Sequence, residues 1–199
     1  MKKFKEIVFN AILLLSAVLV LALMPTEKEG AIYEDTVRLH ILAHSDSKDD
    51  QALKLKIRDK VLRTYGDELS RAASKDDAEE MIRSLTEKIQ GDVDNWLKEL
   101  GYSYKSKVEL VEEWYDTRKY EDFTLPCGYY TSLKIMLGEA EGQNWWCVMY
   151  PPLCLDIATS STPSDDALIQ YSNEEVKLIT NKGYNVKLKI LELLSESIK

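Results

Sequence analysis

The sequence predicts an α+β domain with a mainly antiparallel sheet and two long amphipathic helices packed on one face. Three observations lead to this prediction. Apolar residues alternate with period 2 near residue 40 and again between residues 104 and 150, which is typical of strands. Between these segments they recur every three or four residues, which is typical of helices. The strands and helices come in separate runs along the chain, which favours the α+β class.

The N-terminal segment has the composition of an export signal. Three lysines precede an almost unbroken apolar run from Ile7 to Met24. As a helix, this run would span about 27 Å, close to the roughly 30 Å of a hydrocarbon core. We therefore expect residues 1–24 to form an N-terminal export or anchor helix, either a cleaved signal peptide or a signal anchor. Residues 25–35 are predicted to be a polar linker.

The remaining chain is acidic. Without residues 1–24 it carries 23 basic and 33 acidic residues, a net charge of −10. This charge argues against nucleic acid or an anionic membrane surface as a partner, so membrane contact is expected only through the N-terminal segment. About 175 residues suffice for a domain with a core of its own. We expect the domain over residues 36–157 and a C-terminal extension over residues 158–199.

The first strand and the two long helices have clear local signals. Residues 36–44 alternate with Val37, Leu39 and Ile41 on one side, as in a strand. The tetrapeptide Ser-Lys-Asp-Asp occurs at 47–50 and again at 74–77, each time before a helical stripe. A serine side chain accepts hydrogen bonds at a helix N-terminus, and acidic residues in the first turn favour the helix dipole. We expect helices over 47–65 and 74–100, ended by Gly66 and Gly101.

The second half of the chain is predicted to be rich in strands. Strands are expected at 104–111, 129–137 and 145–150, and the last two are expected to form a hairpin about the loop 138–144. Residues 112–122 are predicted to be a polar connection, and 125–128 a turn. In the extension we expect a polar loop at 158–164, a short strand at 175–180 and a terminal helix at 187–198.

The segment Asn144–Cys154, NWWCVMYPPLC, is the most unusual in the chain. Tryptophan and tyrosine dominate binding hot spots, but they also contribute much of the area buried in protein cores. The block is therefore either a packed corner of the core or an exposed anchor for a partner. On a strand, Trp145 and Trp146 point to opposite faces, so at least one of them is expected to face inward.

The chain has three cysteines, and a pair would be expected to form a disulfide in an oxidising compartment. Cys147 and Cys154 become neighbours if the chain reverses about Tyr150–Pro151. Cys127 would then be left over, as an intermolecular partner or a small buried residue. The alternative is that all three cysteines are reduced and structural.

Catalytic residues are not evident in the sequence. His40 and His44 would lie about 13 Å apart on one face of a strand, too far to bind one metal ion. His40 is expected to be partly buried and hydrogen-bonded near Asp46. The aspartate pairs at 49–50 and 76–77 are explained by helix capping. We expect no catalytic residue, metal or cofactor, and the chain is interpreted as a non-enzyme.

Two segments resemble the stage II sporulation protein R family. They are RLHILAHSDSKDDQALKLKIRD from Arg38 to Asp59, and NWWCVMYPPLC. The turn Leu125–Tyr129 and the glycines of the segment Leu137–Cys154 also fit the family pattern. His44 and Cys127 depart from it, since Asn and Ala are usual there, and 116–121 replaces a P-T-K-x-Y-G-like turn.

The resemblance implies a secreted or membrane-tethered signal of endospore formation, located in the intermembrane space between forespore and mother cell. Its implied partner is a membrane-embedded aspartic protease of the mother cell, whose activation leads to processing of a pro-sigma factor. Our hypothesis is that the receptor-binding residues form a corner closed by a Cys147–Cys154 disulfide. Tyr150→Ala should then abolish activation of the protease while the domain still folds. The corner consists of Trp145, Trp146, Tyr150, Pro151 and Pro152.

Two other functions remain open from the sequence. An exported cell-wall hydrolase could use His40 and Asp46 with a thiol or a metal. A scaffold in the intermembrane space could associate through the helix at 74–100, and would form a stable oligomer.

Overall fold

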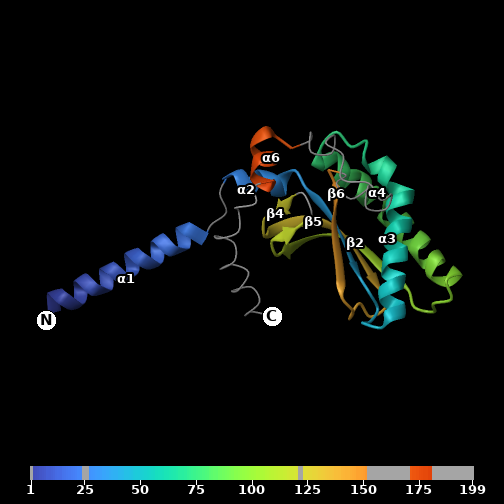
Figure 1. Cartoon of the computed structure of the whole chain (residues 1–199), viewed down its shortest axis with the longest axis horizontal. Helices are drawn as coiled ribbons and strands as arrows, with labels where there is room; N and C mark the ends of the chain where they lie inside the picture. Colours follow the sequence, from blue (N-terminus) through green and yellow to red (C-terminus); the bar gives the residue numbers. More distant parts are fainter. Residues whose placement is uncertain (1, 24–26, 121–122, 152–170, 181–199) are drawn as a thin grey trace.

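The computed structural model describes residues 2–23, 27–120, 123–151 and 171–180. Figure 1 labels most of the helices and strands of these segments. Their bounds are α1 Lys2–Leu23, α2 Glu27–Glu34, β1 Val37–Leu42, α3 Lys48–Leu69, α4 Lys75–Glu99, β2 Ser106–Tyr115, β3 Arg118–Lys119, β4 Thr124–Leu125, β5 Gly128–Leu137, β6 Asn144–Tyr150 and α6 Asn173–Ile179. The fold class is α+β, as predicted from the sequence.

The main sheet has four strands in the order β2-β5-β1-β6. β2 runs antiparallel to β5, and β6 runs antiparallel to β1, whereas β1 and β5 are parallel. The sheet is therefore mixed and mostly antiparallel. The predicted hairpin between residues 129–137 and 145–150 is wrong, because β1 lies between β5 and β6 and pairs with both.

The central strand β1 is buried on both faces. Val37, Leu39 and Ile41 are fully buried on one side, as the alternation predicted. Arg38 is also fully buried, and His40 is only 7% exposed. A strand with neighbours on both edges and cover on both faces must bury its polar side chains, and these then need partners within the protein.

The two predicted helix starts are confirmed. The Ser47 hydroxyl accepts from the Asp50 N–H at 3.1 Å, and the Ser74 hydroxyl accepts from the Asp77 N–H at 3.2 Å. α4 ends at Glu99, and Gly101 follows with φ of +86°. The predicted stop at Gly66 is wrong, because α3 continues to Leu69. A glycine inside a helix costs only about 1 kcal/mol, and continued burial of the stripe beyond it outweighs that cost.

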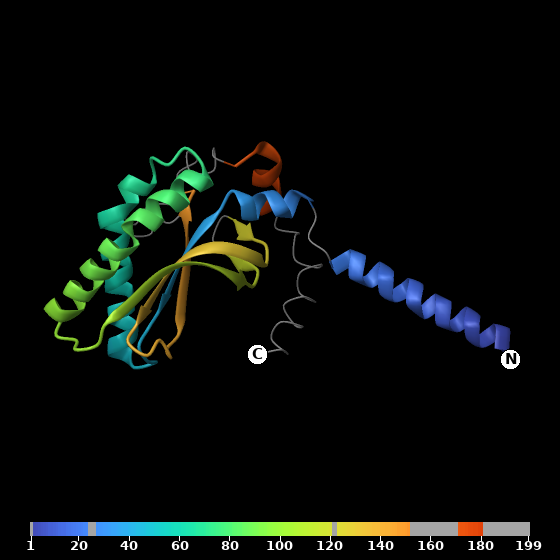
Figure 2. The same ribbon diagram turned by 180° about the vertical axis from the view of Figure 1, so that it is seen from behind.

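Both long helices lie on one face of the sheet, side by side, in the two opposite views of Figures 1 and 2. The Tyr65 hydroxyl donates to the Asp92 carboxylate at 2.5 Å and links α3 to α4. The side chains that the helices bury include Leu53, Ile57 and Val61 of α3 and Ile82, Ile89, Val93 and Leu97 of α4.

Three segments differ from their predictions. The expected polar connection belongs to a strand as far as Tyr115, since β2 pairs with β5 over its whole length. The expected linker contains helix α2, whose Ile32 is fully buried in the core. The expected strand at 175–180 is helix α6. Its start is a capping box: Ser172 N donates to Glu175 Oε2 at 2.6 Å, and Glu175 N donates to Ser172 Oγ at 3.3 Å.

Helix α1 is the N-terminal helix that the sequence predicted. Its apolar side chains are exposed, for example Phe4 at 71% and Leu15 at 70%. Within the described segments, no helix combines the length and apolar content needed to cross a bilayer. The loop at 158–164 and the helix at 187–198 lie outside the described residues. The export signal and the domain boundaries stay predictions.

Candidate functional site

The tryptophan block forms strand β6 at one edge of the sheet, and its second half belongs to the core. Cys147 is fully buried, Val148 is 1% exposed and Met149 is 4% exposed. Tyr150 is 5% exposed, and Pro151 is buried as well. In this conformation Tyr150 and Pro151 offer no surface to a receptor, which favours the core interpretation for this half of the block.

Trp145 and Trp146 lie on opposite faces of β6, as a strand requires. The Arg58 guanidinium of α3 lies 4.9 Å from the Trp145 ring centroid, so Trp145 faces the helix layer. On the other face, Trp146 stacks on His40 with 5.6 Å between ring centroids. The Arg118 guanidinium lies 3.7 Å from the centroid of the Trp146 ring. Both tryptophans are half-buried and have protein partners.

Of the three cysteines, Cys127 and Cys147 lie in the described segments. Cys147 is disulfide-bonded, whereas Cys154 and Pro152 lie outside the described residues, so the Cys147–Cys154 pairing stays a prediction. Cys127 is buried next to β5, and its carbonyl oxygen accepts from the Tyr33 hydroxyl at 2.8 Å.

The burial of Tyr150 changes the expected effect of its removal. Truncation to alanine should lower the free energy of unfolding by about 3 kcal/mol, because a buried aromatic ring leaves a cavity. Urea denaturation of purified protein measures this loss, and Tyr150→Phe serves as the control that keeps the ring. An unfolding midpoint equal to that of the unsubstituted chain would contradict the buried position.

His40 belongs to a buried polar network with Glu113 at its centre. His40 Nδ1 donates to Glu113 Oε1 at 2.8 Å, and Lys134 Nζ donates to Glu113 Oε2 at 2.9 Å. The Tyr115 hydroxyl also lies 2.9 Å from Glu113 Oε1. The other ring nitrogen of His40 contacts the Asn144 side-chain amide at 2.8 Å. Burial alone would raise the pKa of Glu113, but the hydrogen bonds from His40 and Lys134 lower it to about 2.

The predicted contact of His40 with Asp46 is wrong. Asp46 Oδ1 instead accepts from the Gln143 N–H at 2.7 Å. Neither residue is placed for joint acid–base chemistry, since each is engaged in a separate structural contact. No group of three or more metal-binding side chains occurs within the segments that the structure describes.

Arg38 occupies a cage of tyrosines on the same face of β1 as His40. Its guanidinium carbon lies 4.0 Å from the Tyr115 ring centroid and 5.1 Å from that of Tyr130, and Nη2 donates to the Tyr120 hydroxyl at 2.8 Å. Burial raises the pKa values of Tyr115 and Tyr130 well above their usual range. The guanidinium is thus held mainly by aromatic faces. Local sequence patterns could not predict this cage, because its members are far apart in the chain.

At one end of the sheet, the family-like segment Arg38–Asp59 meets the loop before β6, which belongs to the family-like segment Leu137–Cys154. The Glu141 N–H donates to the His44 carbonyl oxygen at 3.2 Å, and the Gly142 N–H donates to that of Ala43 at 3.0 Å. A Cβ atom on Gly142 would lie 2.3 Å from the Ser45 carbonyl oxygen. The glycine is therefore required by the close approach of two backbones.

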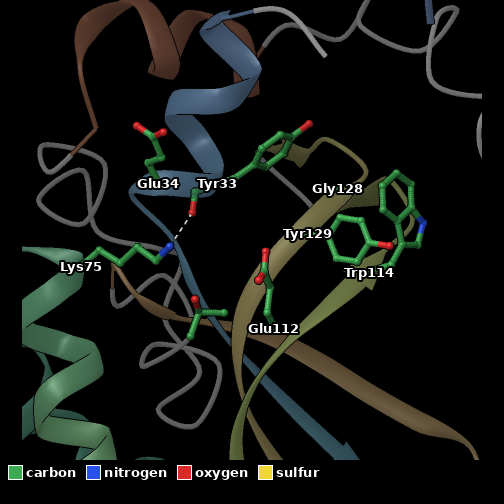
Figure 3. A pocket seen from close by; sticks show the side chains of 8 residues that line it. Tyr33, Glu34, Lys75, Glu112, Trp114, Gly128 and Tyr129 are labelled. Carbon is green, nitrogen blue, oxygen red and sulfur yellow. Dashed lines mark hydrogen bonds between the residues drawn. The ribbon is translucent and has the colours of Figure 1, made fainter. Parts of the chain in front are cut away.

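At the opposite end of the sheet, a cleft of about 380 Å³ opens between α2 and strands β2 and β5. Figure 3 shows the Glu112 carboxylate pointing into it, with Trp114 and Tyr129 on one side and Lys75 on the other. The residues that line the cleft are Tyr33, Glu34, Lys75, Glu112, Trp114, Gly128, Tyr129 and Thr131. None of them was singled out as a site residue from the sequence.

Taken together, the fold and these clusters define an α+β domain with internal polar networks and an open cleft lined by aromatic side chains. The chain belongs to the stage II sporulation protein R family, whose sequence profile matches residues 33–160. It is 35% identical over 160 residues to stage II sporulation protein R of Bacillus subtilis (strain 168), covering 77% of this chain and 71% of that protein. No solved structure matches the chain. The resemblance inferred from the sequence is thereby confirmed, and family membership supports a role in sporulation.

Proposed function

We propose that this chain is an intercompartmental signal of endospore formation. It is exported from the forespore and activates a membrane-embedded aspartic protease of the mother cell, which then processes a pro-sigma factor. The observation that carries the proposal is the family match over residues 33–160, which covers most of the folded body. The net charge of −10 outside residues 1–24 suits a protein partner better than nucleic acid or an anionic membrane surface.

The proposed signal acts by binding. A ligand activates a receptor only if it binds the active state more tightly than the inactive state. A surface that is already ordered loses less entropy on binding, so more of its interaction free energy is available to favour the active state of the receptor. The histidine network and the arginine cage contribute to such order, because they fix the strands from inside. They are consistent with a structural role for His40, which the hydrolase alternative would require as a catalytic group.

The proposal is tested by reconstitution in a non-sporulating bacterial host. The full chain is produced together with the protease and its pro-sigma-factor substrate, and the size of the substrate is followed on a gel. We expect the shorter, processed form only when both the chain and the protease are present. A protease variant lacking its active-site aspartate is the control and should give no processing. Unchanged substrate beside a folded chain and a competent protease would refute the proposed role.

A further inference from the structure

We infer that the cleft between α2, β2 and β5 binds an arginine side chain presented by the receptor, an inference that rests on the proposed function. The receptor surface is then this cleft, and the tryptophan block on β6 supports the fold. Three features of the cleft lead to this assignment: a rigid floor, an aromatic wall with an exposed tyrosine, and a carboxylate that forms no ion pair with another described residue.

The floor of the cleft is set by close packing of α2 on β5. A Cβ atom on Gly128 would lie 2.7 Å from the Tyr33 ring, so only glycine allows the helix to approach this closely. The Tyr33 ring packs edge-to-face on Tyr130 with 5.1 Å between centroids, and its hydroxyl donates to the Cys127 carbonyl oxygen. The cleft is therefore held open by packed groups before any ligand arrives.

The aromatic wall lies where the sheet passes from core to surface. On the helix-bearing face of β5, Leu133 and Ile135 are fully buried, whereas Tyr129 is 60% exposed. Trp114 lies opposite Tyr129 in the β2–β5 register and packs against it edge-to-face, with 5.2 Å between centroids. Trp114 is half-buried and Tyr129 is exposed, and this ordered aromatic pair can offer a ring face to a planar cation.

The charge of the cleft is complementary to a cation. Glu112 is exposed and lies opposite Thr131 in the sheet, and no ion pair among the described residues includes Glu112 or Glu34. Among the described residues that line the cleft, the lysine is Lys75, which already donates to the Tyr33 carbonyl oxygen at 3.1 Å and lies 3.4 Å from Glu79. Nearby, burial together with the charges of Glu175 and Glu34 raises the pKa of Asp35, as expected in a region of negative potential.

Arginine fits these features better than other cations. A guanidinium can stack on Trp114 or Tyr129 while it donates two hydrogen bonds to the Glu112 carboxylate. An ammonium group cannot do both in one plane. The volume of about 380 Å³ is at the small end for ligand sites, which suits a single side chain.

The first test uses the purified full chain and a capped five-residue peptide with arginine at its centre and glycines around it. The indole N–H signal of Trp114 in NMR spectra, assigned with Trp114→Phe, should shift and saturate as peptide is added. The signal of Trp96, on α4, should stay in place. Glu112→Gln should weaken binding roughly tenfold, the loss expected for a charged hydrogen bond. The matched control is Glu109→Gln, on the other face of the same strand, which should change binding less than about twofold.

Three results of this titration would overturn the inference. They are no shift of the Trp114 signal, an equal shift with citrulline in place of arginine, and an equal shift with free spermidine. A peptide with lysine at its centre should bind more weakly than the arginine peptide, and equal binding would also contradict the geometry proposed.

The second test places the same two variants in the processing assay. Glu112→Gln should reduce the processed substrate several-fold, and Glu109→Gln should not. Since Glu112 is exposed, thermal unfolding of both variants should match that of the unsubstituted chain. Normal processing with Glu112→Gln would overturn the assignment of the cleft to the receptor. Absence of processing with the unsubstituted chain would refute the proposed function. The peptide titration contains no protease, so it tests the cleft independently of that function.

Discussion

Replacing Glu113 by alanine lowers the free energy of unfolding by about 3 kcal/mol. The carboxylate accepts hydrogen bonds from His40, Lys134 and Tyr115, and its side chain is only 18% exposed. Removing it leaves these donors without their common acceptor in a largely buried site, and breaking such a pair is costly. Guanidinium or urea denaturation at pH 7 measures the loss.

The same carboxylate makes stability depend on pH. The folded-state pKa of Glu113 is about 2, below the value of 4.5 for an ordinary glutamate. The unfolded state therefore takes up the proton first as the pH falls. The stabilisation is fully present above about pH 4.5 and is lost as the pH falls toward 2. The difference in stability between the unsubstituted chain and Glu113→Gln should shrink over this range.

The control for both measurements is Glu109→Gln, on the same strand and the same face. Glu109 pairs with Lys107, whose side chain is 68% exposed, and surface pairs of this kind contribute little. Its substitution should change stability by less than about 0.5 kcal/mol. A Glu113 variant that behaves like the Glu109 variant, or whose deficit persists unchanged at pH 2.5, would contradict a central role for the carboxylate.

The elements that the sequence predicted well are those with local signals. Both Ser-Lys-Asp-Asp caps, the stripes of α3 and α4 and the alternation of β1 depend on residues within a few positions of one another. Helix α6 was not predicted from the sequence, although Ser172 and Glu175 have capping-box spacing. Its apolar residues were too few for the periodicity to distinguish a helix from a strand.

The pairing of strands could not be predicted in this way. β5 and β6 are close in sequence, so a hairpin was the simplest expectation, but β1 from the start of the domain lies between them. The partners of Arg38 and His40 are non-local for the same reason, since Tyr120 and Glu113 follow them by more than 70 positions. The alternation of apolar and polar residues in β1 predicted the face on which Arg38 and His40 lie, but it could not predict which side chains they contact.

The candidate site illustrates a further limit of sequence patterns. The densest aromatic segment drew attention to β6, yet Tyr150 is buried while Tyr129, in an ordinary strand, is 60% exposed. Composition shows that a segment is rich in aromatic side chains that could bind a partner. Whether such a side chain is exposed depends on the position of its strand relative to the helix layer. Gly142, in the loop that precedes β6, has a clearer physical role, which leads to the second large effect.

Replacing Gly142 by alanine lowers the free energy of unfolding by about 4 kcal/mol. The new Cβ atom would lie 2.3 Å from the Ser45 carbonyl oxygen, which is backbone and cannot rotate away as a side chain can. The loop must move, and the hydrogen bonds from Gly142 to Ala43 and from Glu141 to His44 are then weakened or lost. These bonds contribute about 1 kcal/mol each, and the steric overlap accounts for the remainder. Chemical denaturation of the purified variant measures the total.

Gly91→Ala is the matched control, because it makes the same substitution where space is open. Gly91 is exposed in the middle of α4, and a Cβ atom built there would meet no heavy atom within 4 Å apart from its chain neighbours and the nearby backbone of the same helix. Alanine there should raise the free energy of unfolding by about 0.5–1 kcal/mol, since it removes the entropic disadvantage of glycine in a helix. The two variants thus change stability in opposite directions. A Gly142→Ala variant as stable as the unsubstituted chain would mean that the loop does not pack on residues 43–45.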